Sequence, residues 1–389
     1  MLLEFGGSNF CSFKEWFNID FQLGPNCPGN LKKDSDVAKL ICIKGANSSG
    51  KTNILKFLNF LNDFCANSFQ LKPDENIPLH NYFFNQEPTE IYCLFQDKLT
   101  NTIYKYEAKV NKQEVISECL YRKKSKYVCL INREKNEIVG GTKEFIKKFA
   151  NIKLRNNASI ISTAWQYELE EFKYIYRFFR TIFSNVSLHG LQSTLCDVNF
   201  ASKNLYNQPS DLNFVKKIIQ KFDPALKDIY IDVQKIDGQE RFIPRFKYYI
   251  NDDEKILSYD LQSSGTKALY TNLIFYKIIL DIGGVLALDE FDINLHPDIL
   301  PFLLNLFESS EINKKNAQLI FTTHNIDIMD TMSKYRTYLV NKEEGESYAY
   351  RLDEIPSDLI RNDRSIASLY KSNKIGGTPK FSWDIEDLI

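Results

Sequence analysis

The sequence predicts an α/β fold with a mixed core sheet, an antiparallel side sheet and an inserted helical lobe. A glycine-rich segment follows an apolar strand at residues 38–43 and precedes an amphipathic helix. Alternating apolar and polar residues between positions 90 and 121 indicate half-buried antiparallel strands. Two short apolar runs, residues 285–288 and 318–322, read as parallel core strands buried on both faces.

Length suggests how the chain is organised. At 389 residues it exceeds the usual size of one hydrophobic core, so we expect separate parts. Residues 1–141 would hold the first core strands and the side sheet, residues 142–228 the helical lobe, and residues 229–389 the remaining core strands. The lobe is expected because apolar residues there recur at helical spacing.

Composition excludes several classes of protein. A hydrophobic content of 43% with 25% charged residues excludes wholesale disorder, and a net charge of −1 gives no general electrostatic reason to bind nucleic acid. The N-terminus lacks the basic region of a signal peptide, and the longest apolar stretch, residues 273–288, contains Lys277 and Asp281. We therefore expect a cytoplasmic protein without a membrane segment. Its eight scattered cysteines predict reduced thiols.

The glycine-rich segment, Gly-Ala-Asn-Ser-Ser-Gly-Lys-Thr at residues 45–52, fits the P-loop pattern G-x-x-x-x-G-K-[ST]. In such a loop the backbone N–H groups face phosphate oxygens. Lys51 would neutralise the β- and γ-phosphates, and the Thr52 hydroxyl would reach Mg²⁺. The motif predicts binding of a nucleoside triphosphate with Mg²⁺. The candidate binding residues are Gly45, Asn47, Ser48, Ser49, Gly50, Lys51, Thr52 and Asn53.

The strand at residues 285–288 ends in two carboxylates, as a Walker B element does. Asp289 would hold Mg²⁺ through water, and Glu290 would polarise the water that attacks the γ-phosphate. A strand that ends in Asp-Glu is usually just a solvated strand end. The P-loop upstream favours the functional interpretation, with Asp289 as a metal ligand and Glu290 as a catalytic residue.

The next core strand leads into Thr-Thr-His-Asn, which places His324 at the carboxyl edge of the sheet. Ligands bind at this edge in open α/β sheets, so His324 could donate a hydrogen bond to the γ-phosphate. A lone histidine at a strand end is more often structural, but its place one strand after Asp289 favours a functional role. The predicted catalytic residues are Lys51, Glu290 and His324.

Small polar residues at 261–267 precede an apolar helix that we expect to begin near Ala268. They resemble the signature motif of ABC-type ATPases. Ser263, Ser264 and Gly265 would approach a γ-phosphate at a helix N-terminus; the alternative is an ordinary helix cap by Ser264 or Thr266. The order of P-loop, signature, Walker B and histidine is that of ABC-type ATPases, in which the signature of one copy closes the ATP site of a second. This order implies a homodimer, or a higher homo-oligomer, assembled through ATP.

The chain resembles the soluble ABC-type and AAA-family ATPases of the RecF, SMC and OLD kind. It most resembles stand-alone ATP-binding proteins of bacterial phage-defence and abortive-infection loci. The resemblance implies an ABC-ATPase head, with ATP and Mg²⁺ as ligands. Four segments carry it: N-F-C-S-F-K at residues 9–14, the P-loop region at residues 43–53, the Walker B region at residues 289–297, and the Gly-Gly-Thr-Pro region at residues 370–379.

Some departures from the family pattern limit what is implied. The signature reads Gln-Ser-Ser-Gly-Thr instead of the transporter form, which argues against a transporter subunit. Gln86 is a candidate Q-loop residue, with a polar turn residue before Pro88 as the alternative. Only about 50 residues follow the ATPase strands, too few for a nuclease domain, so the effector is expected to be a separate nuclease or toxin.

The first functional hypothesis is an ATPase that dimerises around ATP and controls a partner effector in anti-phage defence, as a sensor or scaffold. Two alternatives stay open: a RecF-like ATPase that clamps DNA, and a scaffold that binds nucleotide without hydrolysing it. The basic segment Arg-Lys-Lys-Ser-Lys-Tyr at residues 122–127 could contact the phosphates of DNA or could be a solvated hairpin tip.

Overall fold

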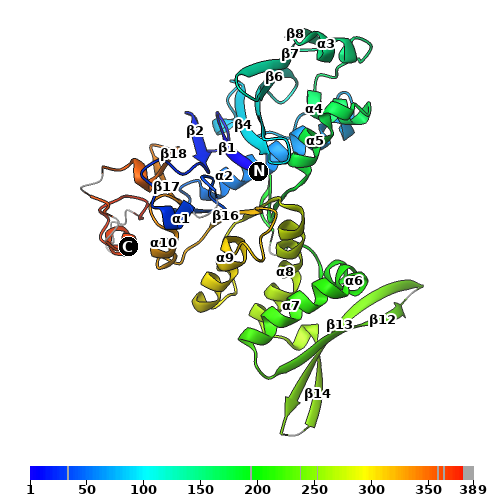
Figure 1. Cartoon of the computed structure of the whole chain (residues 1–389), viewed down its shortest axis with the longest axis vertical. Helices are drawn as coiled ribbons and strands as arrows, with labels where there is room; N and C mark the ends of the chain where they lie inside the picture. The colour runs from blue at the N-terminus through cyan, green and yellow to red at the C-terminus, as the bar shows by residue number, and fades with distance from the viewer. Residues whose placement is uncertain are drawn as a thin grey trace, which may run out of the picture.

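The parallel core sheet lies in the middle of the molecule, with the side sheet at one end and a three-stranded sheet at the other (Figure 1). The glycine-rich segment, in blue, lies in this middle part. The computed structural model describes residues 1–32, 35–192, 195–236, 238–251, 253–356, 359–361 and 364–379.

The core sheet has the strand order β18-β17-β3-β16-β15-β9. All neighbours from β17 to β9 pair in parallel, and β18 pairs antiparallel with β17. The two apolar runs read as parallel strands are confirmed as β15 and β16. The strands are β3 (Leu40–Gly45), β9 (Ile182–Ser184), β15 (Val285–Leu288), β16 (Gln318–Thr322), β17 (Thr337–Glu343) and β18 (Glu346–Arg351).

Apolar side chains on both faces explain why the core strands are continuously hydrophobic. On one face, Ile41 and Ile43 belong to the same buried cluster as helix α2 (Lys51–Asn62). On the other face, Leu40 and Cys42 pack in a cluster with helices α8 (Ser264–Ile282) and α9 (Leu300–Glu308). The alternation along β3 therefore divides its side chains between two cores.

The side sheet is antiparallel throughout, in the order β2-β1-β4-β5-β6-β7-β8. The alternating segments of the sequence form its middle strands, as predicted. One face is buried, and the other faces solvent. The strands are β1 (Leu2–Ser8), β2 (Phe17–Asp20), β4 (Thr89–Asp97), β5 (Thr102–Val110), β6 (Val115–Lys123), β7 (Tyr127–Glu134) and β8 (Glu137–Gly141).

Helices are inserted between the core strands, as predicted, and they lie at both ends of the molecule (Figure 1). α3 (Lys143–Phe149), α4 (Ile160–Gln166) and α5 (Lys173–Arg180) share a core with the side sheet. α6 (Val198–Asn207) and α7 (Pro209–Phe222) pack instead against α8. The division of the chain at residues 141 and 228 stays a prediction.

One part of the predicted helical segment is a strand. Helical spacing suggested that Ile182 and Phe183 continue a helix, but they form β9, which pairs in parallel with β15. A strand of three residues is too short to show an alternating pattern, so only its pairing reveals it. The short strands β10 (Val186–Ser187) and β11 (Gly190–Leu191) follow.

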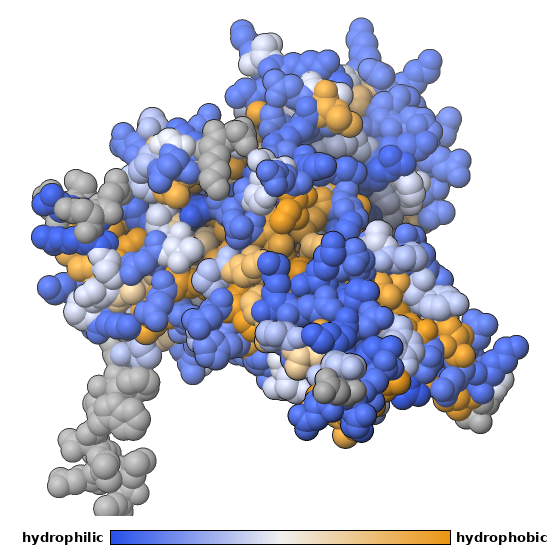
Figure 2. All heavy atoms as spheres, turned by 60° about the horizontal axis from the view of Figure 1, so that its bottom comes forward, coloured by the Kyte–Doolittle hydropathy of each residue, from blue (hydrophilic) through white to orange (hydrophobic). Residues whose placement is uncertain are grey.

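The three-stranded sheet consists of β12 (Leu226–Ile236), β13 (Gln239–Ile250) and β14 (Asp253–Ser258). Its inner face is buried, with Phe246 in the same cluster as α6 and α8. Apolar side chains gather over the outward end of β12 and β13 in the space-filling view (Figure 2). The exposed large apolar residues of this sheet are Val233, Ile236, Tyr249, Ile250 and Ile256.

The C-terminal Gly-Gly segment packs next to β17. Gly377 N donates a hydrogen bond to Asn341 Oδ1 at 2.7 Å, and the Tyr370 hydroxyl donates to Gly377 O at 2.7 Å. None of the helices in the described part of the chain is long and apolar enough to cross a membrane. The remaining helices are α1 (Gly29–Lys32), α10 (Ile328–Met332) and α11 (Ile366–Lys371).

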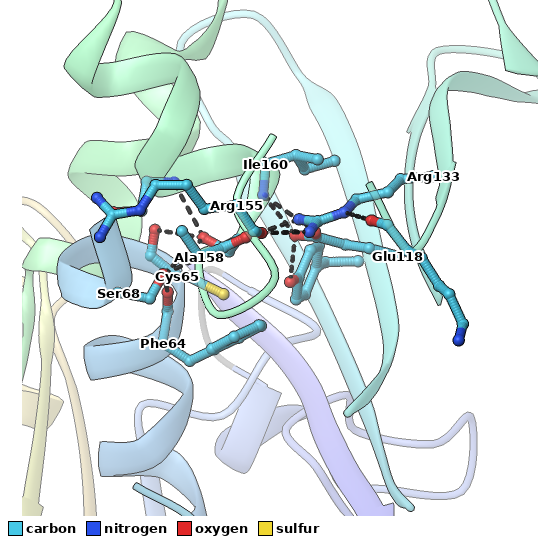
Figure 3. Close-up of polar contacts among 12 residues, drawn as sticks. Phe64, Cys65, Ser68, Glu118, Arg133, Arg155, Ala158 and Ile160 are labelled. Atoms are coloured by element: carbon cyan, nitrogen blue, oxygen red, sulfur yellow. Dashed lines mark hydrogen bonds and ion pairs between the residues drawn. The ribbon is translucent and has the colours of Figure 1, made fainter. Parts of the chain in front are cut away.

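A fully buried ion pair connects the side sheet to the helices beside α2 (Figure 3). Arg133 Nη1 donates to Glu118 Oε2 at 3.1 Å and to Ala158 O at 2.6 Å. Glu118 also accepts hydrogen bonds from the Tyr106 hydroxyl at 2.6 Å and from Ile160 N at 2.9 Å. Burial raises the pKa of Glu118, and Arg133 opposes that rise. The partners on every side satisfy both charges, which a buried pair requires.

Candidate functional site

The P-loop runs from the end of β3 to the start of α2, at the carboxyl edge of the core sheet. Gly50 caps α2 with a φ of +111°, a conformation that L side chains rarely adopt. A Cβ at this position would lie 2.6 Å from Ser347 Oγ and 2.9 Å from Ser12 Oγ. Both the backbone conformation and the lack of space require glycine here.

Lys51 is buried under the loop that it follows. Its Nζ donates hydrogen bonds to Gly45 O at 2.9 Å and Ala46 O at 2.8 Å. Burial lowers the pKa of Lys51, while the charges of Asp289 and Glu290 raise it. In the same loop, Ser49 Oγ is buried and has no hydrogen-bond partner among the described residues. The loop therefore holds one buried cation and one unpaired hydroxyl.

The carboxylate of Asp289 links the P-loop helix to two core strands. Thr52 Oγ1 donates to Asp289 Oδ2 at 2.7 Å, and Thr322 Oγ1 donates to Asp289 Oδ1 at 2.5 Å. Both hydroxyls hold the carboxylate in one orientation. The structure thus brings together two predicted metal ligands, Thr52 and Asp289, that are far apart in the sequence.

The backbone of Asp289 is also held in place by a side-chain amide. Asn185, which follows β9, accepts a hydrogen bond from Asp289 N at 2.7 Å and donates one to Asp289 O at 3.0 Å. Asn185 N also donates to Ala287 O at 3.2 Å, so the main chain and the side chain of Asn185 both bind β15 and the residue after it. Asn185 fixes the point at which the apolar strand ends and the carboxylates begin.

Glu290 has a left-handed backbone conformation with a φ of +49°. For a non-glycine residue this conformation is uncommon and costs about 1–3 kcal/mol, and such residues cluster at functional sites. Its N–H donates to Thr322 Oγ1 at 2.8 Å, which helps to hold this conformation. The partly exposed side chain lies close enough to Lys51 to influence the pKa of the lysine.

The edge of β16 carries His324, whose side chain is exposed. Its backbone N donates to both carboxylate oxygens of Asp292 at 3.2 Å, which joins the Walker B turn to the histidine strand. Lys44 Nζ adds a second connection by donating to Thr323 O at 3.0 Å. Lys44 lies 5.7 Å from the centre of the Tyr370 ring, so the C-terminal segment also packs here.

The signature segment opens α8, which begins at Ser264 and not near Ala268 as predicted. Ser263 is the capping residue, because its Oγ accepts a hydrogen bond from Thr266 N at 3.1 Å. A cap is therefore present, formed by Ser263 and not by Ser264 or Thr266. Ser263 and Ser264 are exposed, and across the described chain no hydrogen bond joins them to the P-loop. Gly265 lies close to the Walker B turn, since a Cβ there would be 3.0 Å from Asn294 O.

Comparison with known families decides the class of protein. The family described as "AAA domain, putative AbiEii toxin, Type IV TA system" matches residues 40–330, well over half of the chain. This chain belongs to that AAA-domain family. The match confirms the predicted P-loop ATPase class, and membership of this class implies nucleotide binding.

Two solved structures are similar to the AAA domain and its flanking residues. The SMC head domain from Thermotoga maritima is 16% identical with a TM-score of 0.44, covering 90% of this chain and 98% of that one. The cbiO1 protein from Clostridium perfringens, part of the ABC transporter complex cbiONQ, is 12% identical with a TM-score of 0.34, covering 95% and 94%. The search of curated proteins found no match.

The AAA domain has the chemistry that a triphosphate with Mg²⁺ requires. The unpaired Ser49 hydroxyl and the Lys51 ammonium are donors suited to phosphate oxygens. Within the described ranges, no group of three or more His, Cys, Asp or Glu side chains could hold a metal. Thr52 and Asp289 match the sparse protein ligation of Mg²⁺, which usually takes its other ligands from phosphates and water.

The N-terminal N-F-C-S-F-K segment packs directly against the P-loop. Ser12 Oγ accepts hydrogen bonds from Asn53 Nδ2 and from Ser347 Oγ, each at 2.7 Å. Asn9 Nδ2 donates to Glu87 O at 2.6 Å and so holds the loop that carries Gln86. Gln86 itself is exposed, and its role as a Q-loop residue stays a prediction. Asn47 and Ser48 are exposed at the tip of the P-loop.

Sequence reasoning missed the residues that hold the predicted ones in place. Thr322, Asn185, Asp292 and Ser347 contact site residues through hydrogen bonds between distant parts of the chain. The threonines after the apolar run of β16 are the only local signal, since hydroxyls at a carboxyl edge can bind a neighbouring carboxylate. Asn185 and Ser347 carry no such signal, because nothing near them in the sequence differs from an ordinary strand end.

Proposed function

We propose that this AAA domain binds and hydrolyses ATP with Mg²⁺, that two copies assemble around ATP, and that the assembly controls a separate effector protein in the cytoplasm during anti-phage defence. The observation that carries the proposal is the 2.7 Å hydrogen bond between Thr52 and Asp289. It joins the P-loop helix to the carboxylate that follows β15, two strands from β3 in the core sheet, and a triphosphate with Mg²⁺ requires a hydroxyl and a carboxylate together in this way.

Each site residue would have a separate task. Lys51 would exchange its two loop carbonyls for phosphate oxygens, which are stronger acceptors for an ammonium group. Glu290 would orient and polarise the attacking water, with its backbone held by Thr322. His324 would donate to the γ-phosphate. Mg²⁺, when bound, would neutralise charge on the β- and γ-phosphates, with Thr52 and Asp289 holding it.

The signature supports assembly into a dimer. Ser263 and Ser264 are exposed at the N-terminus of a 19-residue helix, where backbone N–H groups and the helix dipole favour an anion. These residues make no hydrogen bond to the P-loop of their own chain within the described part. A second copy would therefore supply its signature to each ATP site. Dimerisation would respond to ATP, because the nucleotide lies between the two surfaces.

The role in defence rests on the family. Its description refers to a toxin and to a toxin–antitoxin system, and this supports an abortive-infection context for the chain. The effector would be a separate nuclease or toxin. The dimer would act on it as a sensor or scaffold, so that ATP binding or hydrolysis decides when the effector is released or engaged.

The test measures the mass of the purified protein by light scattering, with and without ATP·Mg²⁺, together with phosphate release. We expect wild type to assemble with ATP and to turn it over. Glu290→Gln should assemble but lose turnover by about 10²- to 10⁴-fold, the usual contribution of a general base.

Two results would count against the proposal. If the mass of both proteins stays that of a monomer, the assembly around ATP is wrong. If wild type assembles but releases no phosphate, the chain is a nucleotide-gated scaffold and not an ATPase. Lys51→Ala is the control for binding, because it should abolish both assembly and turnover.

A further inference from the structure

The outer face of the side sheet carries aromatic and basic side chains side by side. Lys105 Nζ lies 4.2 Å from the centre of the Tyr121 ring and 5.6 Å from that of Tyr127. Lys123 Nζ lies 5.1 Å from the centre of the Tyr127 ring. Pairing of β5, β6 and β7 places these residues in adjacent positions, with Lys105 opposite Tyr121 and Lys123 opposite Tyr127.

The aromatic surface continues towards the N-terminal strands. The centres of the Trp16 and Tyr92 rings are 6.1 Å apart in an edge-to-face arrangement. Tyr92 lies opposite Glu107 on β5, and Glu107 pairs with Lys105 at 2.9 Å, so Tyr92 shares the face of Lys105. We call this surface the basic–aromatic face. Its members are Trp16, Tyr92, Lys105, Tyr121, Lys123 and Tyr127.

Exposure and charge set this face apart from an ordinary solvated sheet. Trp16 keeps 49% and Tyr127 keeps 44% of its surface exposed. At the adjoining hairpin, Arg122, Lys123, Lys124 and Lys126 form no ion pair with any residue that the structure describes. Acidic side chains contact other members of the face and its surroundings: Lys105 pairs with Glu107, Lys109 pairs with Glu90, and the Tyr92 hydroxyl donates to Glu4 Oε2 at 3.1 Å. The hairpin end is therefore locally cationic in a chain of net charge −1.

We propose that the basic–aromatic face binds single-stranded nucleic acid. Half-exposed rings on a sheet can stack with unpaired bases, and neighbouring lysines can bind the phosphates between them. A duplex would offer only its phosphates, because its bases are already stacked on one another.

The proposal goes beyond the proposed function and does not depend on it. Tyr127 and the hairpin lysines belong to the side sheet, and none of them contacts the P-loop or Asp289 through a hydrogen bond in the described chain. Nucleic acid should therefore bind without nucleotide. Lys51→Ala, which should lose ATP binding, should bind nucleic acid as wild type does, so the two proposals can fail separately.

The test is fluorescence anisotropy with labelled, unstructured DNA and RNA strands of about 20 nucleotides, longer than the usual footprint of a stacking surface. A blunt duplex of the same sequence and a polyglutamate competitor are measured in parallel. Wild type should bind the single strands at least about tenfold more tightly than the duplex. Polyglutamate should not displace them at matched charge.

Tyr127→Ala should weaken binding of single strands by about 5- to 150-fold, the range for loss of one stacked base, while Tyr127→Phe should retain it. Tyr249→Ala on β13 is the matched control, because that tyrosine is similarly exposed at the opposite end of the molecule and should leave binding unchanged. Lys124→Ala and Lys126→Ala should each reduce the slope of the logarithm of the binding constant against the logarithm of the salt concentration by about 0.7, whereas Lys235→Ala should leave this slope unchanged.

Other results would overturn the proposal. Absence of binding to single strands would remove it outright. Equal affinity for duplex and single strands, or unchanged binding by Tyr127→Ala, would show that charge alone attracts the probe. Equal displacement by polyglutamate would indicate an acidic protein partner instead of nucleic acid.

Discussion

At the scale of single residues, Asp289 is oriented by side chains from three separate segments. Thr52 and Thr322 hold its carboxylate, and Asn185 holds its backbone. Thr322 also supports Glu290 through the backbone N–H. One buried threonine hydroxyl therefore holds the carboxylate of Asp289 and the backbone of Glu290 in the Walker B turn.

Replacing Thr322 with valine should destabilise the protein by about 1–3 kcal/mol, because the isostere leaves Glu290 N–H without its partner and removes the donor to Asp289. Urea unfolding measures the loss, and titration of Mg²⁺ in a nucleotide-binding assay should show weaker metal dependence. Thr322→Ser keeps the hydroxyl and should retain metal dependence. If Thr322→Val is as stable as wild type, the two hydrogen bonds do not hold the turn.

Lys44 makes stability depend on pH. Burial lowers its pKa from 10.5 to about 8, so the folded state loses this proton at a lower pH than the unfolded chain does. Between these values the unfolded chain binds more protons, and stability must rise with pH. Above pH 8, the free energy of unfolding of wild type should therefore rise by up to about 1.4 kcal/mol per pH unit relative to that of Lys44→Met.

Denaturant unfolding of both proteins without nucleotide, at intervals from pH 7 to pH 10, measures this difference. The contributions of other titrating groups to stability are the same in both proteins and cancel in the difference. A stability difference that does not change with pH would mean that Lys44 titrates normally in the folded state.

At the scale of elements, the ion pair between Glu118 and Arg133 connects β6 and β7 to the segment before α4. That segment contacts the continuation of α2, since Ser159 N donates to Ser68 Oγ at 2.9 Å. The P-loop helix is thereby attached to the side sheet through a buried polar network (Figure 3). This network stabilises the attachment only while Glu118 and Arg133 are both present, because either charge alone would be buried without a partner.

Removing one member of the buried pair should lower the free energy of unfolding far more than removing one member of an exposed pair. Glu118→Ala should destabilise the protein by about 3–5 kcal/mol, because it leaves Arg133 buried and uncompensated. Lys109→Met, in the exposed pair with Glu90, should cost less than about 1 kcal/mol. Thermal and urea unfolding compare the two. Similar losses would show that the buried network is not a strong link between sheet and helix.

At the scale of the whole molecule, the P-loop and the signature lie on one chain but are not joined by hydrogen bonds within the described part. This arrangement makes complementation between copies a direct test of assembly. Lys51→Ala should have no functional P-loop, and Ser263→Arg no functional signature. Each alone should be inactive.

Mixing the two inactive variants should restore up to about half of the wild-type ATPase activity, because only mixed dimers contain a complete site and each has one of the two sites of a wild-type dimer. Phosphate release from the equimolar mixture measures this. A mixture as inactive as its components would contradict independent sites shared between two copies. Activity of Ser263→Arg alone would show that the signature is not needed.

The sequence by itself determined the features that depend on neighbouring residues. The P-loop, its strand and helix, the carboxylates after β15 and the antiparallel strands of the side sheet all follow from local patterns of glycine, charge and apolar spacing. Gly50 and β3 show why such patterns can be predicted from the sequence. The positive φ at position 50 requires glycine, and burial along the whole of β3 requires an almost continuous apolar run. The family match confirms the class that they predicted.

Only the tertiary structure decided which residues hold the site together. Thr52 meets Asp289 across a separation of 237 residues, and Ser347 meets Ser12 across 335. β9 belongs to the core sheet through its pairing with β15, and a strand of three residues is too short to be predicted from its sequence. Helix α8 begins earlier than predicted because Ser263 caps it. The physical reason is the same in each case: hydrogen bonds and strand pairing between distant segments depend on where the packed core brings them, and no local pattern records that.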